Sequence, residues 1–155
     1  MIRKVYVVAL SAMLFSCVAC EKAEIADRHY LNYEQLRASA EPGNWVPTFI
    51  PRSAVEIRAR YKIDTGAELV TFYVAKPDDL SVMSHCKNST KSSTDLPPKG
   101  FLNVTWWPES LFQNQDRNES VARYEFYTCQ GQTFLALERE GGGTRAFYWS
   151  ISVAQ

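Results

Sequence analysis

The clearest pattern in the chain is a strict alternation of apolar and polar residues between positions 55 and 63. The apolar positions are Val55, Ile57, Ala59, Tyr61 and Ile63, and the polar positions between them are Glu56, Arg58, Arg60 and Lys62. Successive side chains of a strand point to opposite faces of a sheet, so this period predicts a strand with one buried and one solvated face. Residues 64–67 are typical of a turn, and residues 69–75 are expected to form the returning strand.

Three further strands are predicted toward the C-terminus, over residues 122–129, 133–140 and 144–152. The connections between them contain Gly131 and the run Gly141–Gly143, which is typical of hairpin turns. The hydrophobic pattern therefore predicts about five strands, mostly paired as antiparallel hairpins.

Two or three short helices complete the expected secondary structure. Asn32 is a favourable N-cap for a helix over residues 33–40. Pro77 and the two aspartates that follow it favour a second helix start, with Cys86 on the inner face of that helix. Residues 87–99 are rich in Ser, Thr, Lys and Pro and are expected to form an exposed loop.

These elements favour an α+β domain, in which two or three short helices pack on one face of a sheet of about five strands. The chain has 155 residues, which is enough for one such domain and too few for two. Residues 33–155 are therefore expected to form a single α+β domain.

The start of the chain has a different character. Arg3 and Lys4 give it a basic beginning, and residues 5–15 are uncharged. A helix needs roughly 20 apolar residues to span a bilayer core, so this run is too short for a transmembrane helix. A basic start followed by a short apolar run and small residues is the pattern of a secretory signal, and residues 1–16 are expected to be a signal peptide.

Two cysteines close this signal, and each resembles the lipid-modified cysteine of bacterial lipoproteins. The local motif favours Cys17, because an apolar and a small residue precede it at the expected spacing. The thiol count favours Cys20, because cleavage there leaves Cys86 and Cys129 as an even pair. Cys17 is the preferred lipidation site and Cys20 the alternative. Residues 17–32 are expected to form a polar lipidated tether.

Export would place the domain in an oxidising compartment. A disulfide between Cys86 and Cys129 is then expected, and two separate buried thiols are the alternative. Several acyl chains on one N-terminal cysteine anchor a protein stably, so the membrane is the first expected partner. Neither Val18 nor Glu21, the residues after the two candidate cysteines, is the Asp that resembles an inner-membrane retention signal. The expected location is the outer membrane, facing the periplasm.

The charge and the motifs of the chain exclude several other partners. Lys and Arg together number 17, and so do Asp and Glu, so there is no basic excess for nucleic acid. The two histidines, His29 and His85, lack the spacing of a metal-binding pair. No phosphate-binding or dinucleotide-binding motif is present. Neither a cofactor nor a metal is expected.

One segment resembles a known active-site loop. Ile63 to Ala67 is similar to the Asp-Thr-Gly-Ala loop of retroviral-type aspartic proteases, which pair two aspartates across a dimer or an internal repeat. The chain has one copy of this loop, so the enzyme alternative is a dimeric aspartic hydrolase that uses Asp64. A hairpin turn with Gly66 at positive φ explains the same residues. The turn is the preferred interpretation, and no catalytic residue is assigned.

Trp106 and Trp107 precede a predicted helical turn over residues 108–111. Exposed tryptophans often anchor protein partners. Burial is the usual environment of tryptophan in a chain with 13% aromatic residues. This pair is the one expected to reach the surface and contact a partner.

Residues 44–57, followed by residues 63–66, resemble a segment of uncharacterised bacterial lipoproteins and YbbD head-type domains. The shared pattern is W-x-P-x-x-x-P-x-S-A-x-x-I, here from Trp45 to Ile57. In that family an Asp-Thr turn and a Phe-rich strand follow, and Asn commonly stands at the position of Gly66, which suits a turn. The resemblance implies no known activity.

The sequence therefore predicts an exported, membrane-tethered lipoprotein whose domain is a non-enzymatic binding or interaction module. The expected partner is a protein or another component of the cell envelope. An inhibitor or immunity protein that caps a toxin or hydrolase in the periplasm is the alternative, because small disulfide-linked domains suit that role.

Overall fold

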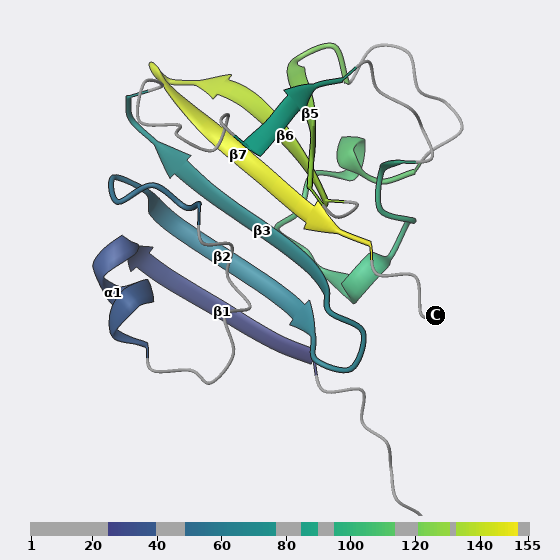
Figure 1. The fold of residues 1–155 in the computed structure, drawn as a ribbon, viewed down its shortest axis with the longest axis horizontal. Helices are drawn as coiled ribbons and strands as arrows, with labels where there is room; N and C mark the ends of the chain where they lie inside the picture. The colour runs from purple at the N-terminus through teal and green to yellow at the C-terminus, as the bar shows by residue number, and fades with distance from the viewer. Residues whose placement is uncertain are drawn as a thin grey trace, which may run out of the picture.

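The computed structural model describes residues 25–39, 49–76, 85–89, 95–113, 121–130 and 133–151. The strands in these ranges form one seven-stranded sheet in the order β1-β2-β3-β7-β6-β5-β4 (Figure 1). The strands are β1 (Ile25–Asn32), β2 (Val55–Lys62), β3 (Ala67–Val74), β4 (Cys86–Asn88), β5 (Tyr124–Cys129), β6 (Thr133–Glu140) and β7 (Gly143–Ser150). Every neighbouring pair is antiparallel.

The sheet is built from two meanders, in which strands that follow one another in sequence also lie side by side. The first comprises β1, β2 and β3, and the second comprises β4, β5, β6 and β7. Their last strands, β3 and β7, pair from Glu68 opposite Ser150 to Val74 opposite Thr144. This pairing joins the meanders and leaves β1 and β4 as the two edges of the sheet.

Within the described ranges, α1 (Tyr33–Ala38) is the one α-helix, and it directly follows β1. The Asn32 side-chain oxygen accepts a hydrogen bond from the Gln35 N–H at 3.0 Å, and the Gln35 side-chain oxygen accepts one from the Leu31 N–H at 2.8 Å. Two amides at the start of the helix are thereby satisfied. The helix predicted after Asn32 is confirmed.

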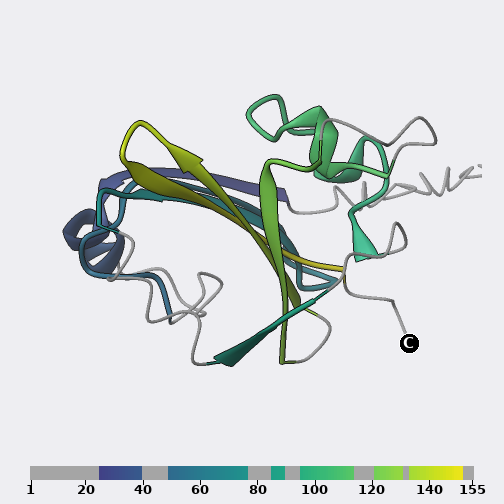
Figure 2. The same ribbon diagram turned by 90° about the horizontal axis from the view of Figure 1, so that it is seen from above.

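Apolar side chains cover both faces of the sheet. The helix face, on which α1 and residues 49–54 pack, contains the buried residues Tyr30, Ile50, Ala54, Ile57, Ala59, Tyr61, Val70, Phe72, Val74, Tyr127, Leu135, Leu137, Ala146 and Tyr148. The loop face, which residues 95–113 cover, contains Leu69, Leu96, Trp107, Leu111, Phe112, Val121, Tyr124, Ala136, Phe147 and Trp149. Figure 2 shows α1 and the 95–113 segment on opposite sides of the sheet.

The five predicted strands are present as β2, β3, β5, β6 and β7. Each of them begins and ends within two residues of the predicted position. The helical turn expected before residue 111 is a 3₁₀ turn over Glu109–Leu111. Periodic burial explains this agreement, because each of these strands packs at least one face against the core.

The expected α+β class is wrong, because the described part of the protein is mostly β. It has seven strands instead of about five, and one short α-helix instead of two or three packed on one face. The strands that the pattern missed are the two edges. In β1 only Tyr30 is buried, and β4 has 3 residues, so neither strand shows a repeating apolar face.

The expected boundaries near the edge strands also change. Residues 25–32, expected to belong to a tether over residues 17–32, form β1 and are part of the sheet. Residues 77–84, which make up most of the second predicted helix, lie outside the described residues. Cys86, expected on the inner face of that helix, is the first residue of β4.

The prediction of an exposed loop over residues 87–99 is wrong at both ends of this range. Its first two residues belong to β4, and residues 90–94 lie outside the described residues. Leu96 is 1% exposed, and the indole N–H of Trp149 donates to the Asp95 carbonyl oxygen at 2.7 Å. The end of this segment therefore begins the cover of the loop face.

Candidate functional site

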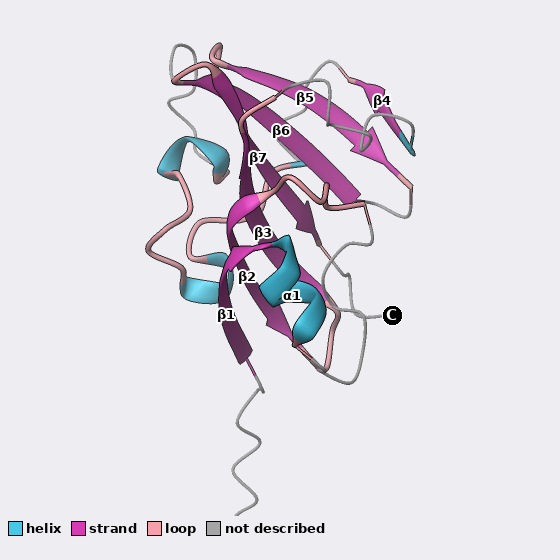
Figure 3. Ribbon diagram, turned by 90° about the vertical axis from the view of Figure 1, so that its left-hand side faces the viewer, coloured by secondary structure: helices cyan, strands magenta, loops and turns pink. Residues whose placement is uncertain are grey.

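β1 is an outer strand of the sheet. It pairs on one side with β2, from Ile25 opposite Lys62 to Asn32 opposite Val55, and no strand of the described ranges pairs with its other side. Figure 3 views the molecule from the side on which β1 and α1 lie. An edge strand presents backbone N–H and C=O groups that can pair with another chain.

The exposed large apolar side chains of the described ranges lie in or next to β1 and β2, at the two ends of this pair of strands. They are Ile25, Leu31, Val55 and Ile63, with exposed fractions of 46%, 61%, 37% and 40%. Two of them lie in β1, one begins β2 and one lies in the turn after β2. We call β1 with these four residues the interaction edge, because an edge strand offers unpaired backbone groups and these side chains add exposed apolar area to it.

Arg60 links the interaction edge to the loop face. Its Nη2 lies 2.9 Å from Asp27 Oδ2, and its Nη1 donates to the carbonyl oxygens of Leu102, at 3.0 Å, and Asn103. Leu102 and Asn103 have φ angles of 53° and 46°, a left-handed conformation that is costly for residues with a Cβ atom. The guanidinium bonds stabilise this turn and hold β1 to β2.

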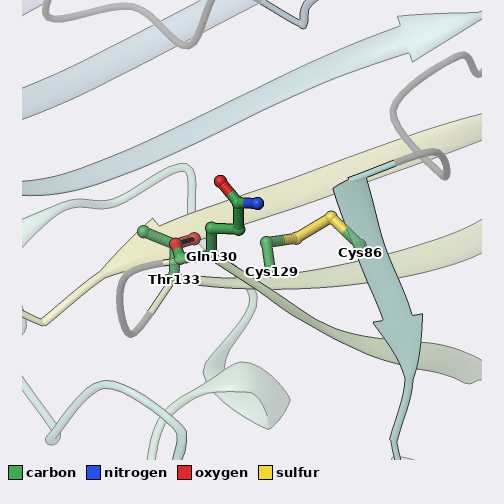
Figure 4. Close-up of a disulfide and its surroundings, with 4 residues drawn as sticks. All are labelled: Cys86, Cys129, Gln130 and Thr133. Atoms are coloured by element: carbon green, nitrogen blue, oxygen red, sulfur yellow. Dashed lines mark hydrogen bonds between the residues drawn. A yellow bond between two sulfur atoms is a disulfide. The ribbon is translucent and has the colours of Figure 1, made fainter.

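The opposite edge, β4, is attached covalently. Cys86 and Cys129 are direct partners in the β4–β5 register, with Cα atoms 4.0 Å apart, and their sulfur atoms form a disulfide (Figure 4). In the turn after Cys129, Thr133 Oγ1 donates to the Gln130 carbonyl oxygen at 2.6 Å. The expected disulfide is present, and it secures a strand that is short for a sheet member.

A half-buried carboxyl group, that of Glu68, lies on the helix face. The strand register places Glu68, Ser150 and Thr133 side by side on β3, β7 and β6. Burial raises the pKa of Glu68 from 4.5 to about 7, although a hydrogen bond with Tyr148 opposes this rise. Burial also raises the pKa of Tyr148, and the nearby Glu68 charge adds to the effect. Glu68 therefore exchanges its proton near neutral pH.

Asp64 lies in the exposed turn between β2 and β3. Its carboxylate is 3.0 Å from Lys62 Nζ. Gly66 has a φ of 67°, and its N–H donates to the Lys62 carbonyl oxygen at 2.9 Å. This geometry supports the turn interpretation of the Asp-Thr-Gly-Ala sequence. Across the described ranges, no group of three or more His, Cys, Asp or Glu residues is placed to hold a metal ion.

The two adjacent tryptophans differ in environment. Trp107 is 3% exposed and packs edge-to-face against Phe147 and Trp149, with ring centroids 5.5 and 6.1 Å away. It is a core residue, so the expectation that it reaches the surface is wrong. Trp106 is half-buried, with its ring centroid 6.0 Å from that of Trp107. Only Trp106 of this pair presents surface to a partner.

The predicted signal, Cys17 and Cys20 lie outside the described residues. Among the helices that the structure describes, none is long and apolar enough to cross a membrane.

Residues 24–73 match the family model of the YbbD head domain. No curated protein and no solved structure matches the chain. The predicted resemblance to YbbD head-type domains is thus confirmed, and it covers β1, α1, β2 and nearly all of β3. The matched segment contains every residue of the interaction edge.

Removal of the disulfide tests its contribution to stability. We expect the double variant Cys86→Ser, Cys129→Ser to unfold with a free energy lower by about 3–4 kcal/mol, because the bond closes a long loop in the unfolded chain. Urea denaturation with and without dithiothreitol measures this loss, and reduced wild-type protein is the matched control. Free thiols at Cys86 and Cys129 in protein isolated from its host without reductant would contradict the assignment.

Stability is expected to depend on the protonation of Glu68. Its pKa in the folded protein is about 7, above the ordinary 4.5, so the folded state holds this proton more tightly than the unfolded state. The contribution of this proton to the free energy of unfolding is fully present below pH 4.5. It is lost as the pH rises through about 7. We expect Glu68→Gln to raise the free energy of unfolding at pH 8 by about 1–3 kcal/mol.

Urea denaturation of both proteins between pH 4.5 and 8 measures this effect. Glu109→Gln, at an exposed position, is the control and should leave the pH profile unchanged. A Glu68→Gln profile that still falls as steeply as that of the wild type would show that another group is responsible.

Proposed function

We propose that the protein is an exported lipoprotein of the bacterial cell envelope whose sheet serves as a non-enzymatic interaction module. The proposed lipidation site is Cys17, with Cys20 as the alternative. The proposed location is the outer membrane, facing the periplasm. The exposed edge strand β1 is the observation that carries the proposed role in binding.

Two features support export with a lipid anchor. Residues 1–16 have the basic start and short apolar run of a secretory signal, and the Cys86–Cys129 disulfide is typical of proteins in oxidising compartments. β1 begins at Ile25, so even a fully extended chain from Cys17 keeps this strand within roughly 30 Å of the lipid. The anchor would hold the interaction edge near the membrane surface.

The geometry of the edges supports a role in binding. A partner strand can add to an exposed sheet edge, where backbone hydrogen bonds supply affinity and alternate side chains supply specificity. β1 has 8 residues and β4 has 3, so β1 offers much the longer ladder. The exposed apolar side chains beside β1 add area that a partner would remove from water.

Cysteine substitutions test the anchor. We expect Cys17→Ala to abolish acylation and to release the protein from the membrane fraction, because the modified thiol is lost. Cys20→Ala should remain acylated. Mass spectrometry of the mature N-terminus and fractionation of the envelope measure both outcomes. The reverse result would assign the lipid to Cys20, and an unmodified N-terminus elsewhere would refute the anchor.

Site-specific photo-crosslinking tests the interaction edge. We expect a photoreactive amino acid in place of Ile25 or His29 to form adducts in intact envelopes, because a bound strand would lie within reach of β1. The same amino acid in place of Glu109, which is exposed in the 3₁₀ turn Glu109–Leu111 and is not part of β1, is the control. Adducts at Glu109 alone, or at no β1 position, would contradict the proposal.

A further inference from the structure

The exposed face of β1 carries a symmetric order of residue types. Tyr30 is buried on the helix face, so the alternate residues of the strand lie on the loop face. These residues are Ile25, Asp27, His29 and Leu31. An apolar residue stands at each end of this series, and an acid, Asp27, and a base, His29, stand between them. A strand with this order is complementary to an antiparallel copy of itself.

We propose that the partner of β1 is a second copy of this chain, which pairs antiparallel along β1 and joins two sheets into one. Arg28 lies on the two-fold axis, opposite Arg28 of the second copy. Ile25 lies opposite Leu31, and Asp27 lies opposite His29, and symmetry repeats each pair. This inference rests on the proposed role of β1 as a binding edge.

The backbone geometry of β1 permits this register. The Leu31 N–H donates to the Gln35 side chain at 2.8 Å, so it is directed away from β2. Alternate residues of a regular strand repeat this direction, which places the N–H groups of Asp27 and His29 on the open side. Antiparallel pairing then matches the donors and acceptors of Asp27 with those of His29, the Leu31 N–H keeps its bond to Gln35, and Arg28 occupies a non-hydrogen-bonded site on the axis.

Side-chain chemistry selects this register over its neighbours. A shift by two residues places either Asp27 opposite Asp27 or His29 opposite His29, and in both cases an apolar end residue meets an ionisable one. Opposite charges and apolar pairs across strands stabilise pairing, whereas like charges in direct opposition destabilise it. The cost of the chosen register is the Arg28 pair, because Arg28 Nη1 donates to the Asp27 carbonyl oxygen at 3.0 Å and the two guanidinium groups must move apart when the strands pair.

The proposed anchor favours such pairing. Edge-to-edge contacts along one strand bury little area, so they are weak between molecules free in solution. Anchoring of both copies to one membrane raises their effective concentration, which strengthens binding without new contacts.

A single engineered cysteine on the axis tests the register in intact envelopes, with the full chain. Directly opposed residues at a non-hydrogen-bonded site have Cα atoms about 4.5 Å apart, which suits a disulfide. We expect Arg28→Cys to give a disulfide-linked species of twice the monomer mass on a non-reducing gel. Leu31→Cys is the matched control: its partner is Ile25, so the two introduced thiols lie far apart and the chain runs at the monomer mass on the gel.

A second substitution tests the side-chain pairs. Leu31 is 61% exposed, so Leu31→Asp should leave the fold intact while it places a charge opposite Ile25. Added to Arg28→Cys, it should reduce the linked species roughly tenfold, which corresponds to about 1.4 kcal/mol. His29→Asp, which places a second carboxylate opposite Asp27, should also reduce it. Urea midpoints of each variant confirm that it folds.

The outcomes separate this inference from the proposed function. No linked species with Arg28→Cys, or equal linkage with Leu31→Cys, would overturn self-pairing. If the photo-crosslinks at β1 then capture a protein of another mass, the interaction edge stands and its partner is a different chain. If β1 forms no adduct of any mass, the interaction edge and self-pairing both fall.

Discussion

The pairing of β3 with β7 is the interaction on which the rest of the structure depends. It joins the two meanders across seven residue pairs, and apolar residues of both strands are buried on the helix face and on the loop face. Val70 and Phe72 contribute to the helix face, whereas Leu69, Phe147 and Trp149 contribute to the loop face. Without this non-local contact, neither meander would have a second layer against which to bury its apolar side chains.

Burial declines from this pair toward both edges, and the edges are held by polar or covalent contacts instead. The Cys86–Cys129 disulfide holds β4 to β5, although β4 is too short to form many backbone hydrogen bonds. At β1 the Asp27–Arg60 ion pair and the capped helix α1 fix the strand, while its outer side takes no strand from the described ranges. The fold therefore ties one edge strand to its neighbour with a covalent bond that needs an oxidising compartment, and the other edge strand, β1, is the longer of the two.

The sequence predicted the elements whose signals are local. Alternating burial identified β2, the Asn32 cap identified α1, and the predicted export to an oxidising compartment identified the disulfide. β1 was missed because its one buried residue, Tyr30, gives no period, and its place in the sheet depends on a ladder with β2. Trp107 was misplaced because its burial depends on distant Phe147 and Trp149. Glu68 was missed because the predicted strand began one residue too late to include it.

The family match covers residues 24–73, yet this segment cannot form its core alone. On the helix face, Tyr127, Leu135 and Tyr148 of the second meander complete the cluster around β2 and β3. On the loop face, Leu69 of β3 packs in a cluster whose other residues all lie after residue 95. Apolar area left open on two faces would outweigh the stability of a three-stranded meander. The cooperative unit is therefore the whole sheet, and the matched segment is the part of it that bears the open edge.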